Sequence, residues 1–203
     1  MNIAIIGTGN VGGALATNWS KKGNTINLGV QDKNYFKGQE LLKNKNTSVY
    51  SINEAVAKSD VILIATPPTA IFEIIGQMGD VSEKIIIDAT NAVMKSPEPY
   101  KTVYHALADK TNAEIVKCFN TTGFENMLNP KYNGEAVDMF MAGDNEKAKS
   151  VARQLALECG FDTCIDFGKS DKVELLEKFA LSWINIAIMQ GQGRDIAFKV
   201  VRR

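Results

Sequence analysis

The beginning of the chain restricts the fold more than any other stretch. An apolar run leads directly into the glycine-rich motif 7–12 (G-T-G-N-V-G), and a helical pattern follows from Val11 to Lys22. In this order of strand, turn and helix, Gly7 permits a tight turn, Gly9 leaves room beside the backbone and Gly12 allows close packing of the helix on the strand. The free N–H groups at the start of such a helix attract phosphate. The motif therefore predicts a dinucleotide-binding unit, with a merely space-saving turn as the alternative.

The charge balance and the hydropathy pattern exclude several classes of partner. Lysine and arginine number 23, as do aspartate and glutamate, so the formal net charge is zero and offers no electrostatic footprint for nucleic acid or an acidic membrane. The most apolar late stretch, residues 179–189, is too short to cross a bilayer. The first expected strand starts at residue 2, which leaves no room for a signal peptide. We therefore expect a soluble, cytoplasmic protein without nucleic-acid or membrane partners.

Cysteine and histidine offer no metal site in this sequence. Cys118, Cys159 and Cys164 have no metal-ligand or CxxC spacing, and we expect them to be reduced and mostly buried. The one histidine, His105, lies in an expected helix over residues 102–110. A solvated or structural role is expected for it rather than a catalytic one.

The rest of the chain alternates short apolar strands with helical segments. The expected strands are Asn2–Ile6, Thr25–Gly29, Ser48–Tyr50, Val61–Ala65, Lys84–Asp88, Glu114–Cys118, Val137–Ala142 and Thr163–Asp166. The expected helices are Val11–Lys22, Phe36–Lys43, Ile52–Lys58, Ala70–Gln77, Thr102–Lys110 and Glu146–Glu158. Continuous runs of valine and isoleucine are typical of strands that are buried on both faces.

We therefore predict an α/β protein of the Rossmann type, with a doubly wound, mostly parallel sheet. Residues 1–168 form the expected NAD(P)-binding domain. Residues 169–203 form a C-terminal helical segment that packs on the same domain: a long helix from Asp171 to Gln190, a break at the Gly-Gln-Gly sequence, and a last helical turn or two up to Arg203.

Four loops that follow strands carry the residues expected to bind ligands, because ligands of such sheets lie outside the carboxyl ends of the strands. These loops are residues 29–33, 65–68, 88–92 and 119–126. Their small, hydroxyl and amide side chains can form hydrogen bonds with a nicotinamide, a ribose or a flat heterocycle. Ordinary turn chemistry explains any one of these loops, but four of them at one edge of a sheet favour a binding site.

Several motifs resemble one family. The glycine motif 7–12, A-T-P at 65–67, F-N-T-T-G-F-E-N-M at 119–127 and Q-G-Q-G-R-D-I-A-F at 190–198 are similar to motifs of the NADPH-dependent reductases of coenzyme F420. They resemble equally the wider group of single-domain NADP oxidoreductases and the nicotinamide-binding domain of membrane metalloreductases. The resemblance implies NADPH over the glycine loop and a deazaflavin stacked near the nicotinamide, in a cleft that the C-terminal segment closes.

The resemblance also implies roles for individual residues. The pyrophosphate would be held by Thr8, Gly9, Asn10 and Val11, between the structural glycines Gly7 and Gly12. The nicotinamide end would be lined by Ala65, Thr66, Pro67, Asn91 and Ala92. The hydride acceptor would be bordered by Asn120, Thr121, Thr122 and Gly123. Asn120 stands where the deazaflavin-reducing members have a histidine, so a flavin and coenzyme F420 both stay open as the acceptor.

The loop after the second strand bears on the choice between NADP and NAD. The family usually has an arginine there for the 2′-phosphate, whereas this chain has Gln31, Asp32 and Lys33. An acidic residue that selects NAD is expected at the strand end about twenty residues past the glycines. Asp32 has that spacing but lies past the strand, where Gly29 and Val30 occupy the selective positions. We expect NADP, held by Gln31, Lys33 and backbone amides, with NAD as the alternative.

No acid–base constellation is apparent, and we assign no catalytic residue. Hydride transfer between stacked rings depends on positioning, which alone can supply roughly 7 to 11 kcal/mol. Since only about 35 residues follow Gly168, we expect a flat acceptor in a shallow cleft, completed in one arrangement by the second subunit of a homodimer. The predicted function is an NAD(P)H-dependent oxidoreductase that acts on a flavin or deazaflavin. The alternative is a non-catalytic NADP(H)-binding sensor or docking module.

Overall fold

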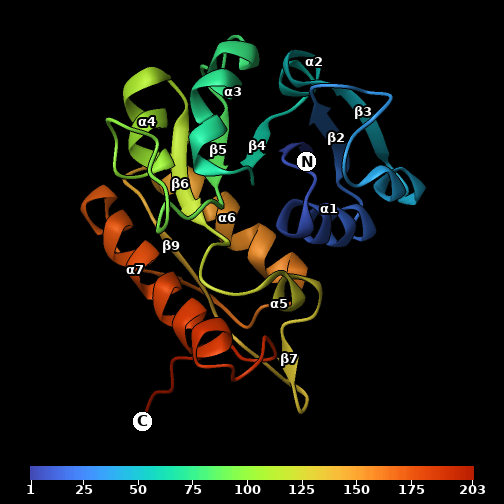
Figure 1. The fold of residues 1–203 in the computed structure, drawn as a ribbon. Helices are drawn as coiled ribbons and strands as arrows, with labels where there is room; N and C mark the ends of the chain where they lie inside the picture. Colours follow the sequence, from blue (N-terminus) through green and yellow to red (C-terminus); the bar gives the residue numbers. More distant parts are fainter.

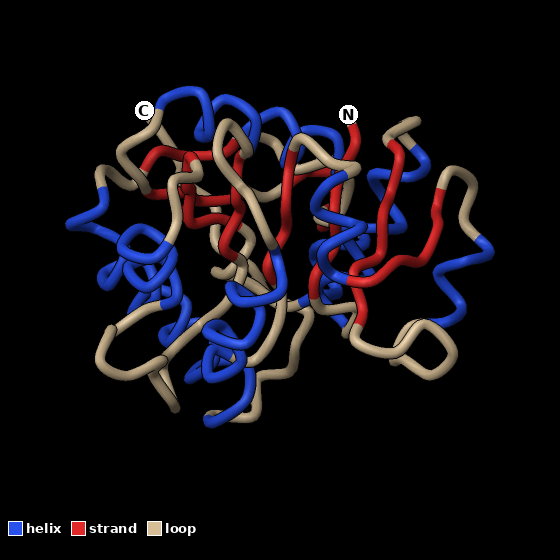
Figure 2. The backbone as a smooth tube through the Cα atoms, turned by 90° about the horizontal axis from the view of Figure 1, so that it is seen from above, coloured by secondary structure: helices blue, strands red, loops and turns tan.

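The computed structural model describes residues 1–203, which form an eight-stranded sheet with helices on both sides of the strands (Figures 1 and 2). The strand order is β10-β9-β6-β5-β4-β1-β2-β3. The strands are β1 (Asn2–Ile6), β2 (Thr25–Val30), β3 (Thr47–Ser51), β4 (Val61–Ile64), β5 (Ile85–Asp88), β6 (Glu114–Cys118), β9 (Met139–Ala142) and β10 (Cys164–Asp166). Strands β1 to β6 are parallel, and β9 joins β6 in the antiparallel sense. The prediction of a doubly wound, mostly parallel sheet is confirmed.

Alternate residues of each strand supply two separate cores. In β1, Ile3 and Ile5 belong to one cluster of buried side chains, and Ala4 and Ile6 belong to the other. The first cluster is covered by α1 (Asn10–Lys21) and α6 (Glu146–Cys159). The second is covered by α2 (Ile52–Ala57), α3 (Ile71–Met78), α4 (Val103–Lys110) and α7 (Val173–Ile184). Burial on both faces explains why these strands read as continuous apolar runs.

The helix expected over residues 36–43 is shorter in the structure and of a different type. The structure has only a 3₁₀ turn there, η1 (Gln39–Lys43). Gly38 precedes the turn with a φ of 93°, and a Cβ at this position would lie 2.6 Å from the Thr8 carbonyl oxygen. The chain therefore folds back tightly against the glycine loop, and an α-helix cannot begin before this point.

The end of the chain also differs from the prediction. Helix α7 continues as a π-helical turn, η4 (Asn185–Met189), and residues 190–203, which we call the C-terminal tail, contain no helix. Gly191 and Gly193 have positive φ values of 68° and 85°, which reverse the chain. The tail then runs back from the end of α7 (Figure 1). Phe198 of the tail stacks on Phe179 of α7 with ring centroids 4.5 Å apart. The last helical turns expected up to Arg203 were wrong because ring stacking and backbone hydrogen bonds hold the tail extended.

Two small elements were not expected from the sequence. A five-residue helix, α5 (Phe124–Leu128), follows β6, and a hairpin of β7 (Lys131–Tyr132) and β8 (Glu135–Ala136) follows α5. The hairpin has a recognisable signal, because Asn133-Gly134 is a preferred two-residue turn and both residues have positive φ.

The thiols and His105 lie as expected. The three cysteines are buried and form no disulfide, and burial raises the pKa of the Cys159 thiol to about 12, which makes it unreactive. His105 Nδ1 lies 2.7 Å from the hydroxyl of Thr102, which caps the start of α4. None of the helices is long and apolar enough to span a membrane.

Candidate functional site

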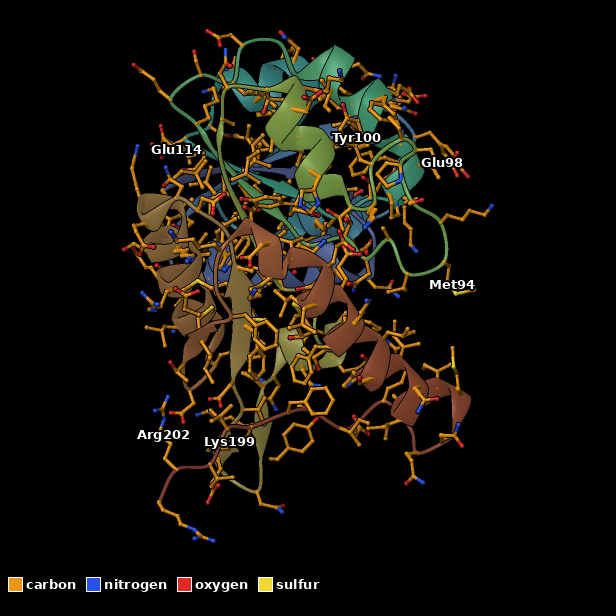
Figure 3. All side chains as sticks on the ribbon, turned by 90° about the vertical axis from the view of Figure 1, so that its left-hand side faces the viewer. Met94, Glu98, Tyr100, Glu114, Lys199 and Arg202 are labelled. Carbon is orange, nitrogen blue, oxygen red and sulfur yellow. The ribbon has the colours of Figure 1, made fainter.

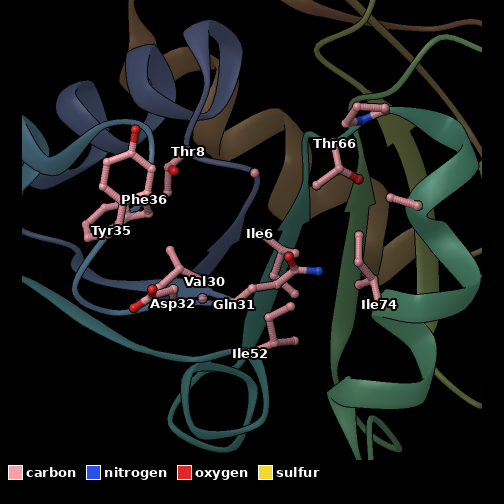
Figure 4. Close-up of a pocket in the computed structure, with 14 residues that line it drawn as sticks. Ile6, Thr8, Val30, Gln31, Asp32, Tyr35, Phe36, Ile52, Thr66 and Ile74 are labelled. Carbon is pink, nitrogen blue, oxygen red and sulfur yellow. The ribbon is translucent and has the colours of Figure 1, made fainter.

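A cavity of about 360 Å³ opens at the carboxyl ends of β1, β2 and β4 (Figure 4). The chain leaves β1 toward β2 on one side and later returns to β4 on the other, so this is the point where the strand order reverses. Of the residues predicted to bind the cofactor, the cavity is lined by Gly7, Thr8, Gln31, Asp32, Thr66 and Pro67. The structure therefore brings together three separate loops of the sequence prediction.

The three positions of the motif are occupied by glycine for different structural reasons. A Cβ at Gly7, whose φ is 102°, would collide with the Ala65 carbonyl, and a Cβ at Gly12 would collide with the Gly7 carbonyl. The fold itself therefore requires these two glycines. A Cβ at Gly9 would meet nothing within 4 Å. Gly9 is thus not required by packing within the chain, and the open space beside it fits the approach of a ligand to the backbone.

The start of α1 is free of side-chain partners. Gly9 occupies the N-cap position without a capping side chain, and the first turn contains no acidic residue. The first N–H groups of Asn10 and Val11 and the positive end of the helix dipole therefore face the loop unneutralised. Thr8 is committed elsewhere, since its hydroxyl donates a hydrogen bond to the Lys37 carbonyl. The geometry fits an anionic group such as a pyrophosphate at this helix end.

In the folded protein, the loop after β2 lies beside two glutamates that are distant from it in the sequence. Gln31 Nε2 donates to Glu73 Oε1 of α3 at 2.6 Å, and Asp32 Oδ1 accepts from the Asn34 amide at 2.8 Å. Lys33 does not line the cavity; its Nζ lies 3.6 Å from Glu54 of α2. Hydrogen bonds from Ser51 and the charge of Lys33 lower the pKa of the Glu54 carboxyl, so Glu54 is ionised at neutral pH. The sequence analysis did not foresee Glu73 or Glu54 beside these residues.

The loop after β4 places an unsatisfied hydroxyl beside the cavity. Thr66 lines the cavity, and its Oγ1 is buried without a hydrogen-bond partner. Such a group costs about 1 to 3 kcal/mol when it is left unpaired. Ala65 does not line the cavity, but its carbonyl packs against Gly7. The orphaned hydroxyl indicates that this wall is built for a polar ligand.

The loops after β5 and β6 are joined by two amide side chains. Asn91 Nδ2 donates to the Asn120 carbonyl at 2.7 Å, and Asn120 Nδ2 donates to Asn91 Oδ1 at 3.0 Å. Because the backbone carbonyl can only accept, it fixes which way the Asn91 amide faces, and Asn91 in turn fixes Asn120. Ala92 follows Asn91, and its amide donates to Glu177 of α7 at 2.8 Å. Asn91 and Asn120 therefore connect the two loops, and Ala92 connects the β5 loop to α7.

The remaining predicted acceptor residues contact the C-terminal part of the chain. Thr121 is buried, and Thr122 Oγ1 accepts a hydrogen bond from Asn126 at 2.6 Å. Trp183 of α7 packs so closely that a Cβ at Gly123 would lie 2.8 Å from its ring. Trp183 also donates to the Ile196 carbonyl of the C-terminal tail at 2.7 Å. The tail and α7 therefore form a wall next to the β6 loop.

A charged cluster below these loops was missed by the sequence analysis. Lys117 of β6 contacts Asp88 of β5 and Glu177 of α7, and all three are buried. Burial raises the pKa of the Glu177 carboxyl, while the charge of Lys117 opposes this shift. A lysine inside the apolar run 114–118 was the signal that could have revealed the cluster.

Comparisons with known structures identify the class of protein. A candidate F420-dependent NADP reductase from Arthrobacter sp. FB24 superposes with a TM-score of 0.87 over 100% of both chains, at 21% sequence identity. A reductive aminase from Aspergillus terreus, solved with NADPH and ethyl levulinate, superposes with a TM-score of 0.71 over 94% of this chain and 62% of its own, at 18% identity. Fold and cavity together define a Rossmann-type α/β protein.

Comparisons of sequence give narrower matches over parts of the chain. Residues 2–92 match the family described as NADP oxidoreductase coenzyme F420-dependent, which confirms the resemblance in this part of the chain. A glycerol-3-phosphate dehydrogenase [NAD(P)+] from Thermoanaerobacter sp. (strain X514) is 29% identical over 214 residues. That match covers 88% of this chain, and the chain spans 64% of the length of the dehydrogenase. The protein is therefore related to NADP-dependent oxidoreductases.

Proposed function

We propose that this protein binds NADP(H) at the cavity beside β1, β2 and β4 and transfers a hydride between the nicotinamide and a flavin or deazaflavin. The observation that carries the proposal is the glycine motif. Gly7 and Gly12 are required by packing, whereas the space beside Gly9 is open and faces an uncapped helix start. A dinucleotide phosphate accounts for both features, because it needs close approach to the backbone and free N–H groups.

Each part of the cofactor has a group of residues to receive it. The backbone of Gly9, Asn10 and Val11 would hold the pyrophosphate, and the loop of Gln31 and Asp32 would receive the adenosine ribose. The ring end would lie near Thr66 and Pro67 and toward Asn91 and Ala92. The unpartnered Thr66 hydroxyl supports a polar contact on this side. When bound, NADPH supplies the hydride, and the residues of the chain bind the cofactor and orient its ring.

The acceptor would lie against Asn120, Thr121, Thr122 and Gly123. None of these side chains ionises near neutral pH, so their contribution is to position a flat ring and to exclude water. The paired amides of Asn91 and Asn120 link this group to the ring end of the cofactor site. A flavin or deazaflavin suits such a site because its ring takes up a hydride without a nucleophile from the protein.

A stopped-flow panel tests the proposal. The purified protein is mixed anaerobically with NADPH or NADH and with FMN, FAD, riboflavin or coenzyme F420, and oxidation of the nicotinamide is followed by absorbance. We expect rapid oxidation with at least one of these acceptors and a higher affinity for NADPH than for NADH. Tight NADPH binding without oxidation by any acceptor would favour a non-catalytic sensor, and no binding of either nucleotide would refute the proposal.

A further inference from the structure

Three buried charged side chains lie under the loop that follows β5. They are Asp88 at the end of β5, Lys117 in β6 and Glu177 in α7, with side-chain exposures of 0%, 0% and 6%. The proposed function uses none of them. Charges of this kind are seldom buried unless they are fully paired.

Lys117 is fully paired, and it bridges the sheet to α7. Its Nζ donates to Asp88 Oδ2 at 2.9 Å, to the Thr90 carbonyl at 2.6 Å and to Glu177 Oε1 at 2.5 Å. An ammonium group has three protons to donate, so these contacts use its whole capacity. The geometry leaves no freedom for the lysine and fixes both carboxylates around it.

The same cluster holds the backbone of residues 88–92. The Thr90 amide donates to Asp88 Oδ1 at 2.9 Å, and the Thr90 carbonyl accepts from Lys117. The Ala92 amide donates to Glu177 Oε2 at 2.8 Å. Asn91 lies between these anchored residues. The loop is therefore held on both sides of Asn91 by side chains of the charged cluster.

Glu177 has two different partners, one for each oxygen. Oε1 accepts from Lys117 and Oε2 accepts from the Ala92 amide, so one carboxylate connects the buried charge with the loop. Attachment of α7 does not depend on it, because Val173 and Leu176 already pack in the core beneath the helix. A buried ion cluster is also a weak source of stability compared with apolar packing. The buried position of Glu177 is thus better explained by its contact with residues 88–92 than by attachment of α7.

We propose that Glu177 is a positioning residue for hydride transfer: it fixes residues 88–92 and thereby sets the Asn91–Asn120 amide pair at the ring end of the cofactor. The proposal rests on the proposed function, since it assumes that the nicotinamide lies beside Asn91. Glu177 touches neither cofactor nor acceptor in it and acts through the Ala92 amide and Lys117. The same link makes α7, whose Trp183 borders the acceptor side at Gly123, a support for both halves of the site.

Glu177→Gln separates positioning from stability. Glutamine keeps the size of the side chain but has a single oxygen, so it can accept from Lys117 or from Ala92 but not from both. Binding is followed with NADPH, whose emission increases when the reduced ring is held in a protein site, and with 2′,5′-ADP, which lacks the nicotinamide half. We expect the emission increase to fall at least about twofold while the Kd for 2′,5′-ADP changes by less than about twofold, because only the ring end loses its support. With an acceptor found in the panel, kcat should fall about tenfold.

Glu174→Gln is the matched control, because Glu174 lies one turn earlier on α7 and pairs with Lys101 at the surface. It should leave all three measurements unchanged. An unchanged NADPH emission in Glu177→Gln, or an equal loss of 2′,5′-ADP affinity, would overturn the positioning role while leaving the proposed function intact. No binding of NADPH or NADH to the unaltered protein would instead overturn the proposed function and, with it, this role. If Glu177→Gln does not fold, Glu177→Asp, which keeps the charge but shortens its reach, takes its place under the same criteria.

Discussion

The two halves of the candidate site are built in different ways. The half beside β1, β2 and β4 depends on backbone geometry at the glycine loop and the start of α1, although side chains such as Tyr35, Phe36 and Ile52 also line its cavity. The half after β5 and β6 is formed by side chains, in which Asn91 and Asn120 depend on Lys117 and Glu177. The three loops of the first half lie within residues 6–74, whereas the second half needs a helix more than 80 residues away from β5.

The family model matches only one part of the site divided in this way. The family match ends at residue 92 and so covers the backbone-built half and the β5 loop, but not β6 or α7. In the proposed site, the loops and helices of the second half would determine which molecule lies beside the nicotinamide. A shared cofactor with different acceptors is what we expect when the common part is made of backbone and the variable part of side chains.

Gly9→Val should break the backbone-built half most strongly. The valine side chain would fill the open space beside the helix start, so we expect NADPH affinity to fall by at least about a hundredfold, in line with loss of close phosphate approach. The fold should survive, since nothing in the chain contacts a Cβ there. Isothermal titration with NADPH and NADH measures the effect.

Gly76→Val supplies the control for this comparison. Gly76 lies on the exposed side of α3, where a Cβ also meets nothing within 4 Å. This variant should bind NADPH normally even if its helix is slightly weakened by a β-branched residue. Unchanged NADPH affinity in a folded Gly9→Val protein would contradict the dinucleotide assignment.

Asn120→Ala should affect the side-chain-built half without disturbing the other. Alanine loses the hydrogen bond from Asn120 Nδ2 to Asn91 Oδ1 but keeps the backbone carbonyl that accepts from Asn91. We expect hydride transfer to slow by one to two orders of magnitude, or about 1.4 to 2.7 kcal/mol. NADPH affinity should stay close to normal because the phosphate contacts lie elsewhere. Single-turnover oxidation of NADPH across a range of pH measures both the rate and its pH dependence.

The pH profile decides what Asn120 does. If the residue only positions the acceptor, the unaltered protein and Asn120→Ala share one profile. A steep dependence near neutral pH that disappears in the variant would instead indicate a proton-transfer network, and the flavin or deazaflavin mechanism would lose its support. Asn126→Ala is the control, because Asn126 bonds with Thr122, Tyr132 and the Ile196 carbonyl rather than with Asn91, and its loss should lower thermal stability more than the rate.

The sequence predicted the backbone-built half well because its signals are local. The strand, turn and helix around residues 7–12 follow one another in the chain, and β-strand positions follow from short apolar runs. Of the predicted cofactor residues, Lys33 pairs with Glu54 and does not line the cavity. No local pattern states that α2 and α3 direct carboxylates toward this loop.

The side-chain-built half was only partly predictable. Asn120 and its neighbours were predicted from their position after a strand and from the family resemblance, whereas the carboxylate partners of Lys117 are 29 and 60 residues away in the chain. The tail was expected to be helical because its residues tolerate a helix, yet stacking of Phe198 on Phe179 decides its conformation. The exposure of Met94 was also not predicted: this side chain, in the segment between β5 and α4, points away from the body of the protein (Figure 3). Contacts between residues that are distant in the chain cannot be predicted from local sequence patterns.

The smallest expected effect concerns the loop after β2, whose side chains would distinguish NADPH from NADH in the proposed site. Gln31 is held by Glu73, so an arginine at position 31 would pair with that carboxylate before it could reach a 2′-phosphate. We expect Gln31→Arg alone to change the ratio of NADPH to NADH affinity by less than about threefold, because Glu73 would neutralise the new charge. Gln31→Arg combined with Glu73→Gln should raise that ratio about tenfold, as expected for one charge-assisted contact of about 1.4 kcal/mol. Glu135→Gln, on the distant β7–β8 hairpin, serves as the control for removal of an acidic residue. Titration of each variant with both nucleotides gives the affinity ratios. If Gln31→Arg alone reaches the tenfold change, Glu73 does not restrain position 31. If the combined variant shifts both affinities equally, this loop does not face the 2′ position of the ribose.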